Sequence, residues 1–194
     1  MVIYPNGKQN DLSKTINYAH RGMSLEDDLN ATNQYYLDAD MAAIYKKPTP
    51  IRITKVDYKS RSTAKITEAF FQTPSTTDYN GVYKGLYLDF EAKETQSKTS
   101  LVLSMIHPHQ LKHMERVIRY DGIAFMIVRF TEKDETFFVL ASKVLDFIKE
   151  TNRKSIPYSW FVENGELIKY NYAVKVDYLK VIDNLYFGGI NCEK

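Results

Sequence analysis

The chain has 194 residues and a formal net charge of +2, because 26 lysines and arginines nearly balance 24 aspartates and glutamates. At this length a single domain spanning residues 1–194 can bury a sizeable hydrophobic core. The near-neutral balance excludes a histone-like polycation, so any polyanion must be bound by a local cluster of basic residues. The composition also excludes the disordered, collagen-like and disulfide-scaffold classes.

The single cysteine, Cys192, has no partner for an internal disulfide, which favours a reducing cytoplasm. No apolar run approaches the roughly 20 residues that span a bilayer, and residues 1–6 lack the pattern of a signal peptide. We therefore expect a cytoplasmic protein without membrane contact. Residues 1–18 are polar, and we expect them to form a flexible N-terminal segment.

Charged residues are distributed unevenly over the first third of the chain. Residues 21–40 carry five acids and one base, whereas residues 41–72 carry seven bases and two acids. Such a run usually marks a solvated face, but Tyr58, Phe70 and Phe71 place aromatic rings among these charges. Basic and aromatic side chains together can bind phosphates and stack on unpaired bases. The seven bases, which we predict to contact DNA, are Lys46, Lys47, Arg52, Lys55, Lys59, Arg61 and Lys65.

The first clear element is a helix that begins after Ser24, because Ser24 and Asp27 form a capping-box pattern. A strand over 41–45 follows and is broken by the two prolines of residues 48–50. Residues 51–56 and 64–67 are β-branched and alternate in polarity, which predicts a long basic hairpin. Residues 74–81 have the composition of a turn.

The second half of the chain predicts a mixed α/β fold. From residue 86 to residue 93 apolar and charged side chains alternate, so the charged ones share one face of a strand. A helix is expected from Pro108. Apolar strands over 123–130 and 136–141 follow. The last two predicted helices lie near 142–151 and 174–187.

Three residues have the chemistry needed to hydrolyse a phosphodiester. Asp78 lies in the predicted turn, and Glu91 and Lys93 lie on the charged face of the next strand. Two carboxylates can hold a divalent cation, and a nearby lysine can stabilise charge on the phosphate. The spacing alone is weak evidence, because Asp57 and Lys59 repeat it, and a turn residue beside a solvated strand face fits equally well.

Other residues with reactive side chains have equally ordinary explanations. Glu26 is either a further active-site acid or a capping-region carboxylate. His109 and His113 have the spacing of a zinc pair, with His107 close by. Because residue 110 is Gln rather than the Glu of a metalloprotease, surface or DNA-facing histidines are favoured. Cys192 is not expected to be a nucleophile.

Several segments, in the same order along the chain, resemble the bacterial RecU Holliday junction resolvases. The resemblance runs from about Tyr4 to Phe187. Its blocks are the residues 21–26, 33–36, 47–50, 74–81, 89–95, 109–110, 153–156 and 177–178.

The resemblance implies a restriction-endonuclease-like core, a central mixed sheet flanked by helices, from which a basic β-hairpin stalk at 48–73 protrudes. It also implies a homodimer that cuts four-way DNA junctions with Mg²⁺. Asp78 and Glu91 would be metal ligands, Thr76 and Gln110 would complete the metal site directly or through water, and Lys93 would stabilise the transition state.

We therefore expect a Mg²⁺-dependent endodeoxyribonuclease that resolves Holliday junctions by symmetric cleavage in recombination and repair, with Mn²⁺ as a substitute metal. A recombinase and branch-migration proteins are expected as partners beside the four-way junction. Two alternatives remain open at this point. One is a junction-binding or recombinase-regulating module without catalysis, and the other is a sequence-specific restriction-type nuclease.

Overall fold

The computed structural model describes residues 24–72 and 75–188. The helices are α1 (Leu25–Asp38), α2 (Pro108–Arg119), α3 (Ala141–Glu150), α4 (Tyr158–Asn164) and α5 (Tyr178–Tyr186). The strands of the largest sheet are β1 (Ala43–Lys46), β4 (Tyr79–Tyr83), β5 (Leu86–Thr95), β7 (Ile123–Phe130), β8 (Glu135–Leu140) and β10 (Glu166–Ile168). The smaller elements are β2 (Ile51–Asp57), β3 (Lys65–Phe71), β6 (Ser100–Val102), β9 (Ser155–Pro157) and the 3-10 helices η2 (Leu103–Met105) and η3 (Thr131–Lys133).

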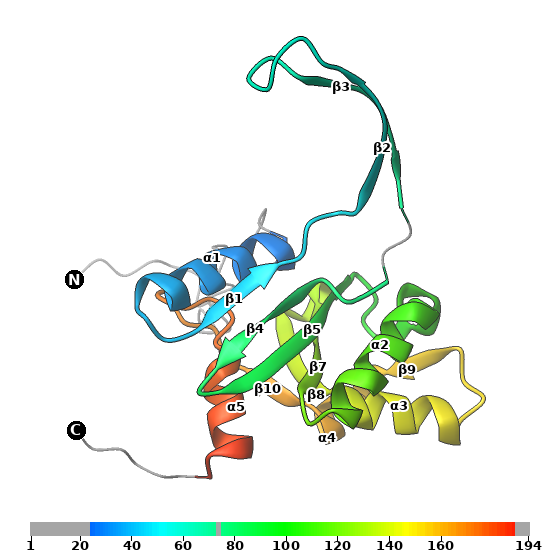
Figure 1. The fold of residues 1–194 in the computed structure, drawn as a ribbon. Coiled ribbons are helices and arrows are strands. Elements are labelled where there is room, and N and C mark those ends of the chain that lie inside the picture. The colour runs from blue at the N-terminus through cyan, green and yellow to red at the C-terminus, as the bar shows by residue number, and fades with distance from the viewer. Residues whose placement is uncertain (1–23, 73–74, 189–194) are drawn as a thin grey trace, which may run out of the picture.

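The largest sheet has six strands in the order β1-β4-β5-β7-β8-β10 (Figure 1). Its central pair, β5 and β7, is parallel, and every other pair is antiparallel. Along the chain, β6, η2 and α2 connect these two parallel strands, and β6 pairs with β9, which follows α3. The predicted mixed α/β fold with a central mixed sheet flanked by helices is therefore confirmed.

The sheet is covered on both faces, and each face has its own apolar core. Ile123, Phe125 and Ile127 of β7 pack with α1 and α5, while Met126 and Val128 pack with α2, α3 and α4. A central strand buried on both faces has to be apolar throughout, and β7 is apolar at seven of its eight positions, all but Arg129.

Aromatic stacking fixes the strands that carry the acids. The ring of Phe90 lies between Tyr79 and Phe125, with ring centroids 4.8 and 4.6 Å apart. Tyr79 opens β4 and pairs with Phe90 across the ladder. Aromatic pairs of this kind add to the stability gained from burial alone. The neighbours of Phe90 and Tyr79, on the opposite face, are therefore held in fixed positions.

The N-terminal helix begins as the sequence predicts. The hydroxyl of Ser24 accepts from the backbone N–H of Asp27, and the carboxylate of Asp27 accepts from the N–H of Ser24. Leu25 and Tyr36 of α1 are buried, as the apolar repeat requires. Asp28 is also buried, where it pairs with Arg129 at 2.8 Å.

The predicted hairpin is present as the two-stranded sheet β2–β3, which stands away from the six-stranded sheet (Figure 1). We call residues 51–71 the stalk. Its strands pair from Ile51 opposite Phe71 to Asp57 opposite Lys65. Every residue of β2 is exposed, so no core supports the stalk from either side.

Some boundaries differ from the prediction. The turn expected over 74–81 is shorter, because β4 already begins at Tyr79 and continues the pairing with β1. The helix expected over 174–187 begins only at Tyr178, since the N–H of Val176 is held by the hydroxyl of Thr32. The strands β6, β9 and β10, the helix α4 and the 3-10 helices η2 and η3 were not predicted. The segment 1–18 lies outside the described residues.

In the described part of the chain, no helix combines the length and the apolar character needed to cross a bilayer.

Candidate active site

Glu91, one of the two predicted metal-binding acids, lies on the face of β5 that is turned toward α2. Leu88 and Phe90 face the core with α1 and α5, so the alternation of the strand places Asp89, Glu91 and Lys93 on the other face. At Asp89 and Glu91 this face is not solvated. The side chains of Asp89 and Glu91 are both 0% exposed. Buried carboxylates require specific partners, because desolvation disfavours their charged form.

One oxygen of Glu91 is held by two donors, and the other has none. Oε1 accepts from Lys93 Nζ and from Gln110 Nε2, each at 2.6 Å. Oε2 is buried and has no hydrogen-bond partner among the described residues. Burial, followed by the neighbouring carboxylate of Asp78, raises the pKa of Glu91 from its usual 4.5 to about 8. Without a cation, the site therefore favours a protonated Glu91.

Asp78 lies directly before β4, where the strand pairing ends. Its backbone carbonyl accepts from the N–H of Lys47 at 2.7 Å. Its carboxylate accepts a long contact of 3.4 Å from the N–H of Ala92. The carboxylate is close enough to Glu91 to raise the pKa of that residue. The structure thus brings together the two acids that are 13 residues apart in the sequence.

The first turn of α2 is docked onto Glu91 by Gln110. The amide Nε2 of Gln110 donates to Glu91, and its carbonyl Oε1 accepts from the backbone N–H of His107 at 2.8 Å. The side chain of Gln110 therefore orients Glu91 and caps the helix at the same time. Thr76 is half-buried in the turn before Asp78, and its hydroxyl donates to the carbonyl of Thr77 at 3.3 Å.

These groups fit a small divalent cation that takes oxygen ligands. Within residues 24–72 and 75–188, no group of three or more His, Cys, Asp or Glu side chains is arranged so that all of them could hold a metal ion. A metal ion at this site would therefore be coordinated by Asp78 and Glu91, and neutral oxygens and water would fill its other coordination positions. Mg²⁺ is commonly bound in this way, since it keeps several of its waters. The unpartnered Oε2 of Glu91 is the atom that such an ion would satisfy.

The structure places Lys47, predicted to contact DNA, in a different role. Its ammonium group donates to the carboxylate of Asp89 at 2.7 Å and to the hydroxyl of Thr77 at 3.0 Å. Its side chain is 18% exposed. The charge of Lys47 is thus already engaged by a buried acid, which the sequence pattern could not reveal. The neighbouring Lys46 is exposed and pairs with Glu26.

Glu26 lies in the first turn of α1, and its side chain is 55% exposed. Its ion pair with Lys46 fits the capping-region explanation, while its role as a further acid stays a prediction. The histidines were expected on the surface or facing DNA, and of these two alternatives the first does not hold for His113. Its ring is half-buried, with Nε2 3.1 Å from the carboxylate of Asp89.

Asp89 and Tyr87 were not singled out as site residues by the sequence. Tyr87 donates its hydroxyl to Asp89 at 2.9 Å. Both share the polar face of β5 with Glu91, so the alternation that located Glu91 could have found them. The burial of Asp89 could not be read from that pattern, since a solvated face has the same alternation, and Tyr87 itself is 40% exposed.

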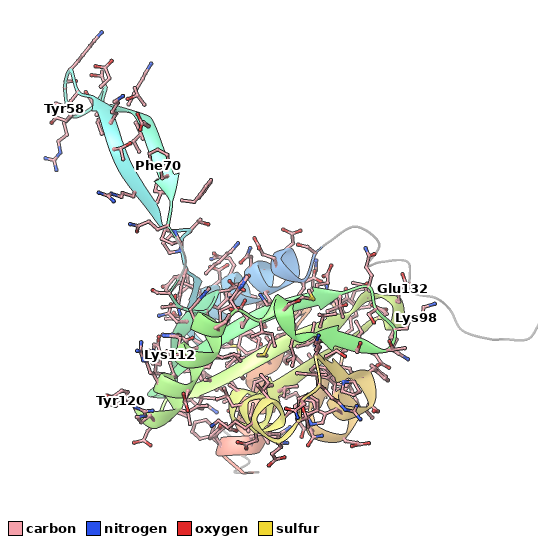
Figure 2. All side chains as sticks on the ribbon, turned by 90° about the vertical axis from the view of Figure 1, so that its right-hand side faces the viewer. Tyr58, Phe70, Lys98, Lys112, Tyr120 and Glu132 are labelled. Atoms are coloured by element: carbon pink, nitrogen blue, oxygen red, sulfur yellow. The ribbon has the colours of Figure 1, made fainter. Side chains whose placement is uncertain are left out.

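The stalk carries the remaining predicted DNA contacts and many exposed apolar side chains. Figure 2 shows Tyr58 near its end and Phe70 on its side, both well away from the six-stranded sheet. Their exposed fractions are 67% and 57%. Lys55 pairs with Glu68 at 3.1 Å. In the described ranges the structure shows no ion pair for Arg52, Lys59, Arg61 and Lys65.

Comparison with known proteins identifies the family to which this chain belongs. A sequence profile of the RecU family, described as Recombination protein U, matches residues 20–184. The Holliday junction resolvase RecU of Oceanobacillus iheyensis is 50% identical over 194 residues, which cover 95% of this chain and 99% of that protein. The Holliday junction resolvase RecU of Bacillus cereus strain G9842 is also 50% identical, over 96% of this chain and 99% of its own length.

A solved structure of Hjc from Archaeoglobus fulgidus, titled a Holliday junction resolvase from an archaeal hyperthermophile, is similar with 10% sequence identity. It covers 70% of this chain and 93% of its own, with a TM-score of 0.41. The family follows from the profile match over residues 20–184 and from the two relatives, each of which is 50% identical over at least 95% of this chain. The chain belongs to the RecU family.

Proposed function

We propose that this protein is an endodeoxyribonuclease that resolves four-way DNA junctions, and that it cuts with a divalent metal bound at Asp78 and Glu91. The two relatives that are 50% identical to this chain are named Holliday junction resolvases. The observation that carries the metal assignment is the buried, unpartnered Oε2 of Glu91 beside a second carboxylate. Mg²⁺ is the ion we propose, with Mn²⁺ as a substitute.

Each side chain of the site has a separate task in this proposal. A bound Mg²⁺ would activate a water and neutralise charge on the phosphate. Asp78 and Glu91 would hold the ion, while Gln110 keeps Glu91 oriented and Thr76 contributes a hydroxyl directly or through water. Lys93, with its ammonium group 2.6 Å from Glu91, would stabilise the charge that develops on the phosphate oxygens.

The stalk supports the choice of a branched substrate. An isolated two-stranded hairpin is at best marginally stable in water, so one with exposed aromatic and basic side chains gains from a partner surface. A four-way junction offers both phosphates and an open centre where rings can stack. We propose that Arg52, Lys59, Arg61 and Lys65, with Lys46 and Lys55, contact this DNA.

A homodimer is part of the proposal, because two strands must be cut symmetrically. One chain carries a single site of this kind in its described part, and a two-fold axis would present two sites to the two strands. A recombinase and branch-migration proteins are proposed as partners in the cytoplasm, where junctions would be formed and moved.

The test is a cleavage assay on a synthetic mobile four-way junction, beside linear duplex of the same sequence, in Mg²⁺ or in EDTA. We expect paired symmetric nicks in the junction in Mg²⁺ alone. Asp78→Ala and Lys93→Ala should abolish cleavage while junction binding is kept. Lys98→Ala is the matched control, because Lys98 is 67% exposed and 3.7 Å from Glu132 (Figure 2).

The same assay separates the alternatives. Near-normal cleavage by Asp78→Ala or Lys93→Ala would refute the assigned site. Tight junction binding without cleavage in Mg²⁺ or Mn²⁺ would favour a binding module. Cleavage of linear duplex at one motif, without preference for the junction, would favour a restriction-type nuclease.

The role of the stalk can be tested without disturbing its base. Replacing residues 54–68 with an Asn-Gly turn keeps the pair Ile53–Ala69 and shortens the hairpin. We expect the preference for the junction over linear duplex to fall sharply. An unchanged preference would show that the stalk does not recognise the junction.

A further inference from the structure

A second buried carboxylate, Asp89, lies beside the proposed metal site and has no task in it. Asp89 precedes Glu91 by two residues on the same face of β5, and its side chain is 0% exposed. A buried charge is retained only where partners compensate its lost hydration. The partners of Asp89 therefore show which parts of the fold this charge connects.

Four side chains from different parts of the chain converge on Asp89. Oδ1 accepts from the hydroxyl of Thr77, in the turn before β4. Oδ2 accepts from Lys47 Nζ at 2.7 Å and from the hydroxyl of Tyr87 at 2.9 Å, and lies 3.1 Å from His113 Nε2. We call these five residues the Asp89 hub. It joins the segment after β1, the turn before β4, strand β5 and helix α2.

Lys47 gives the hub its link to Asp78. The backbone N–H of Lys47 donates to the carbonyl of Asp78 at 2.7 Å, while its ammonium group bonds to Thr77 and Asp89. Along the chain, Lys47 precedes the Pro48-Thr49-Pro50 segment that leads into the stalk. One residue thus connects the base of the stalk, the backbone of Asp78 and the strand of Glu91.

The position of Asp78 depends on this link, because other restraints on it are weak. The pairing of β4 with β5 begins one residue later, at Tyr79 opposite Phe90. The carboxylate of Asp78 has a long 3.4 Å contact with the N–H of Ala92 and lies beside the carboxyl group of Glu91, which is itself a proposed metal ligand. Mg²⁺ requires near-ideal octahedral geometry, so a shift of one carboxylate weakens its binding.

We propose that Lys47 and Asp89 are positioning residues of the cleavage site, which hold the Asp78 turn in place relative to Glu91. This inference rests on the proposed function of Asp78 and Glu91 as metal ligands. Lys47 then acts on cleavage through the metal site, and its ammonium group makes no contact with DNA phosphate. The base of the stalk is accordingly part of the scaffold of the active site.

The test compares Lys47→Met, Asp89→Asn and the double variant with the unchanged protein. Mg²⁺ affinity is measured without DNA by calorimetry, junction affinity is measured in EDTA, and cleavage rate is measured against Mg²⁺ concentration. For each single variant we expect Mg²⁺ affinity to fall about 10- to 100-fold. Junction affinity should stay within about twofold, because the phosphate contacts that supply it are unchanged. High Mg²⁺ should restore part of the cleavage rate.

The double variant separates positioning from simple stability. Removing both charges leaves no unpaired buried charge, so its thermal midpoint should recover toward that of the unchanged protein. Its Mg²⁺ affinity should stay low, because the link from the stalk base to Thr77 and β5 is still missing. If the thermal midpoint and the Mg²⁺ affinity of the double variant both recovered, Lys47 and Asp89 would be no more than a structural ion pair, and the inference would be overturned.

Arg129→Met is the matched control, because Arg129 and Asp28 form a buried pair of the same kind, 11% and 0% exposed. This variant should lose stability and keep its Mg²⁺ affinity. If Lys47→Met instead weakens junction binding in EDTA and leaves Mg²⁺ affinity unchanged, Lys47 is a DNA contact and the inference fails. Cleavage by the unchanged protein in EDTA would refute the proposed metal site itself, which is a distinguishable outcome.

Discussion

Glu91→Gln should make the metal-free protein more stable, and the gain should grow with pH. Glu91 is fully buried, and its pKa is raised from 4.5 to about 8, first by desolvation and then by Asp78. Between these values the folded state holds a proton that the unfolded state has released. Since the folded state binds more protons there, the free energy of unfolding must fall as pH rises from 4.5 to 8.

The size of the effect follows from the shift. Each pKa unit corresponds to about 1.4 kcal/mol, so the full cost of ionising Glu91 in the folded state is on the order of 3 to 5 kcal/mol. The amide introduced by Glu91→Gln would have the neutral shape that protonated Glu91 already has at low pH. The two proteins should therefore be equally stable near pH 4.5, and the variant should lead by about 3 to 5 kcal/mol at pH 8.5.

The assay is urea unfolding in EDTA at a series of pH values, followed by circular dichroism. Glu132→Gln is the control, because Glu132 is 52% exposed and its replacement should give only a small difference. A difference between Glu91→Gln and the unchanged protein that is flat with pH, or that favours the unchanged protein at pH 8.5, would refute the reasoning. Added Mg²⁺ should stabilise only the unchanged protein, since binding to the folded state alone raises stability.

Three further outcomes are expected. Gln110→Ala removes a donor to Glu91 and should weaken Mg²⁺ binding about 10- to 100-fold in calorimetry; an unchanged affinity would contradict the contact. Gly81→Ala should lower the free energy of unfolding by about 3 kcal/mol, because the added Cβ would lie 2.2 Å from the Ala43 carbonyl oxygen. Urea unfolding measures this loss, and a loss below about 1 kcal/mol would be inconsistent with that packing. Replacing Lys59 and Arg61 with Gln should lower the slope of log junction affinity against log salt by about 2, and an equal slope would remove them from the DNA contacts.

Local patterns in the sequence predicted the elements and the face on which the acids lie. Alternation over β5 separates Leu88 and Phe90 from Asp89 and Glu91, and this depends only on the period of a strand. The cap at Ser24 and the β-branched stalk strands likewise follow from neighbours along the chain. The stalk and the acidic face could therefore be predicted from the sequence alone.

The burial of that face could not be predicted from the sequence, because it depends on contacts between distant segments. Lys47 and Asp89 are 42 residues apart, and His113 and Asp89 are 24 apart. A lysine in a basic run and a histidine on a helix have no local feature that marks them as partners of a buried acid. The late start of α5 has the same origin, since Thr32 holds Val176 across 144 residues.

The charges of the site explain how one cluster can accept a cation and then a polyanion. Three carboxylates, Asp78, Asp89 and Glu91, face two ammonium groups, those of Lys47 and Lys93, which are already paired with Asp89 and Glu91. Without a cation the raised pKa of Glu91 favours its protonated form, so, leaving the imidazole of His113 aside, this set is then neutral. A divalent cation that binds in place of that proton gives the set a net charge of +1, which attracts a phosphate at short range. The same residues therefore hold a phosphate only where the metal is present.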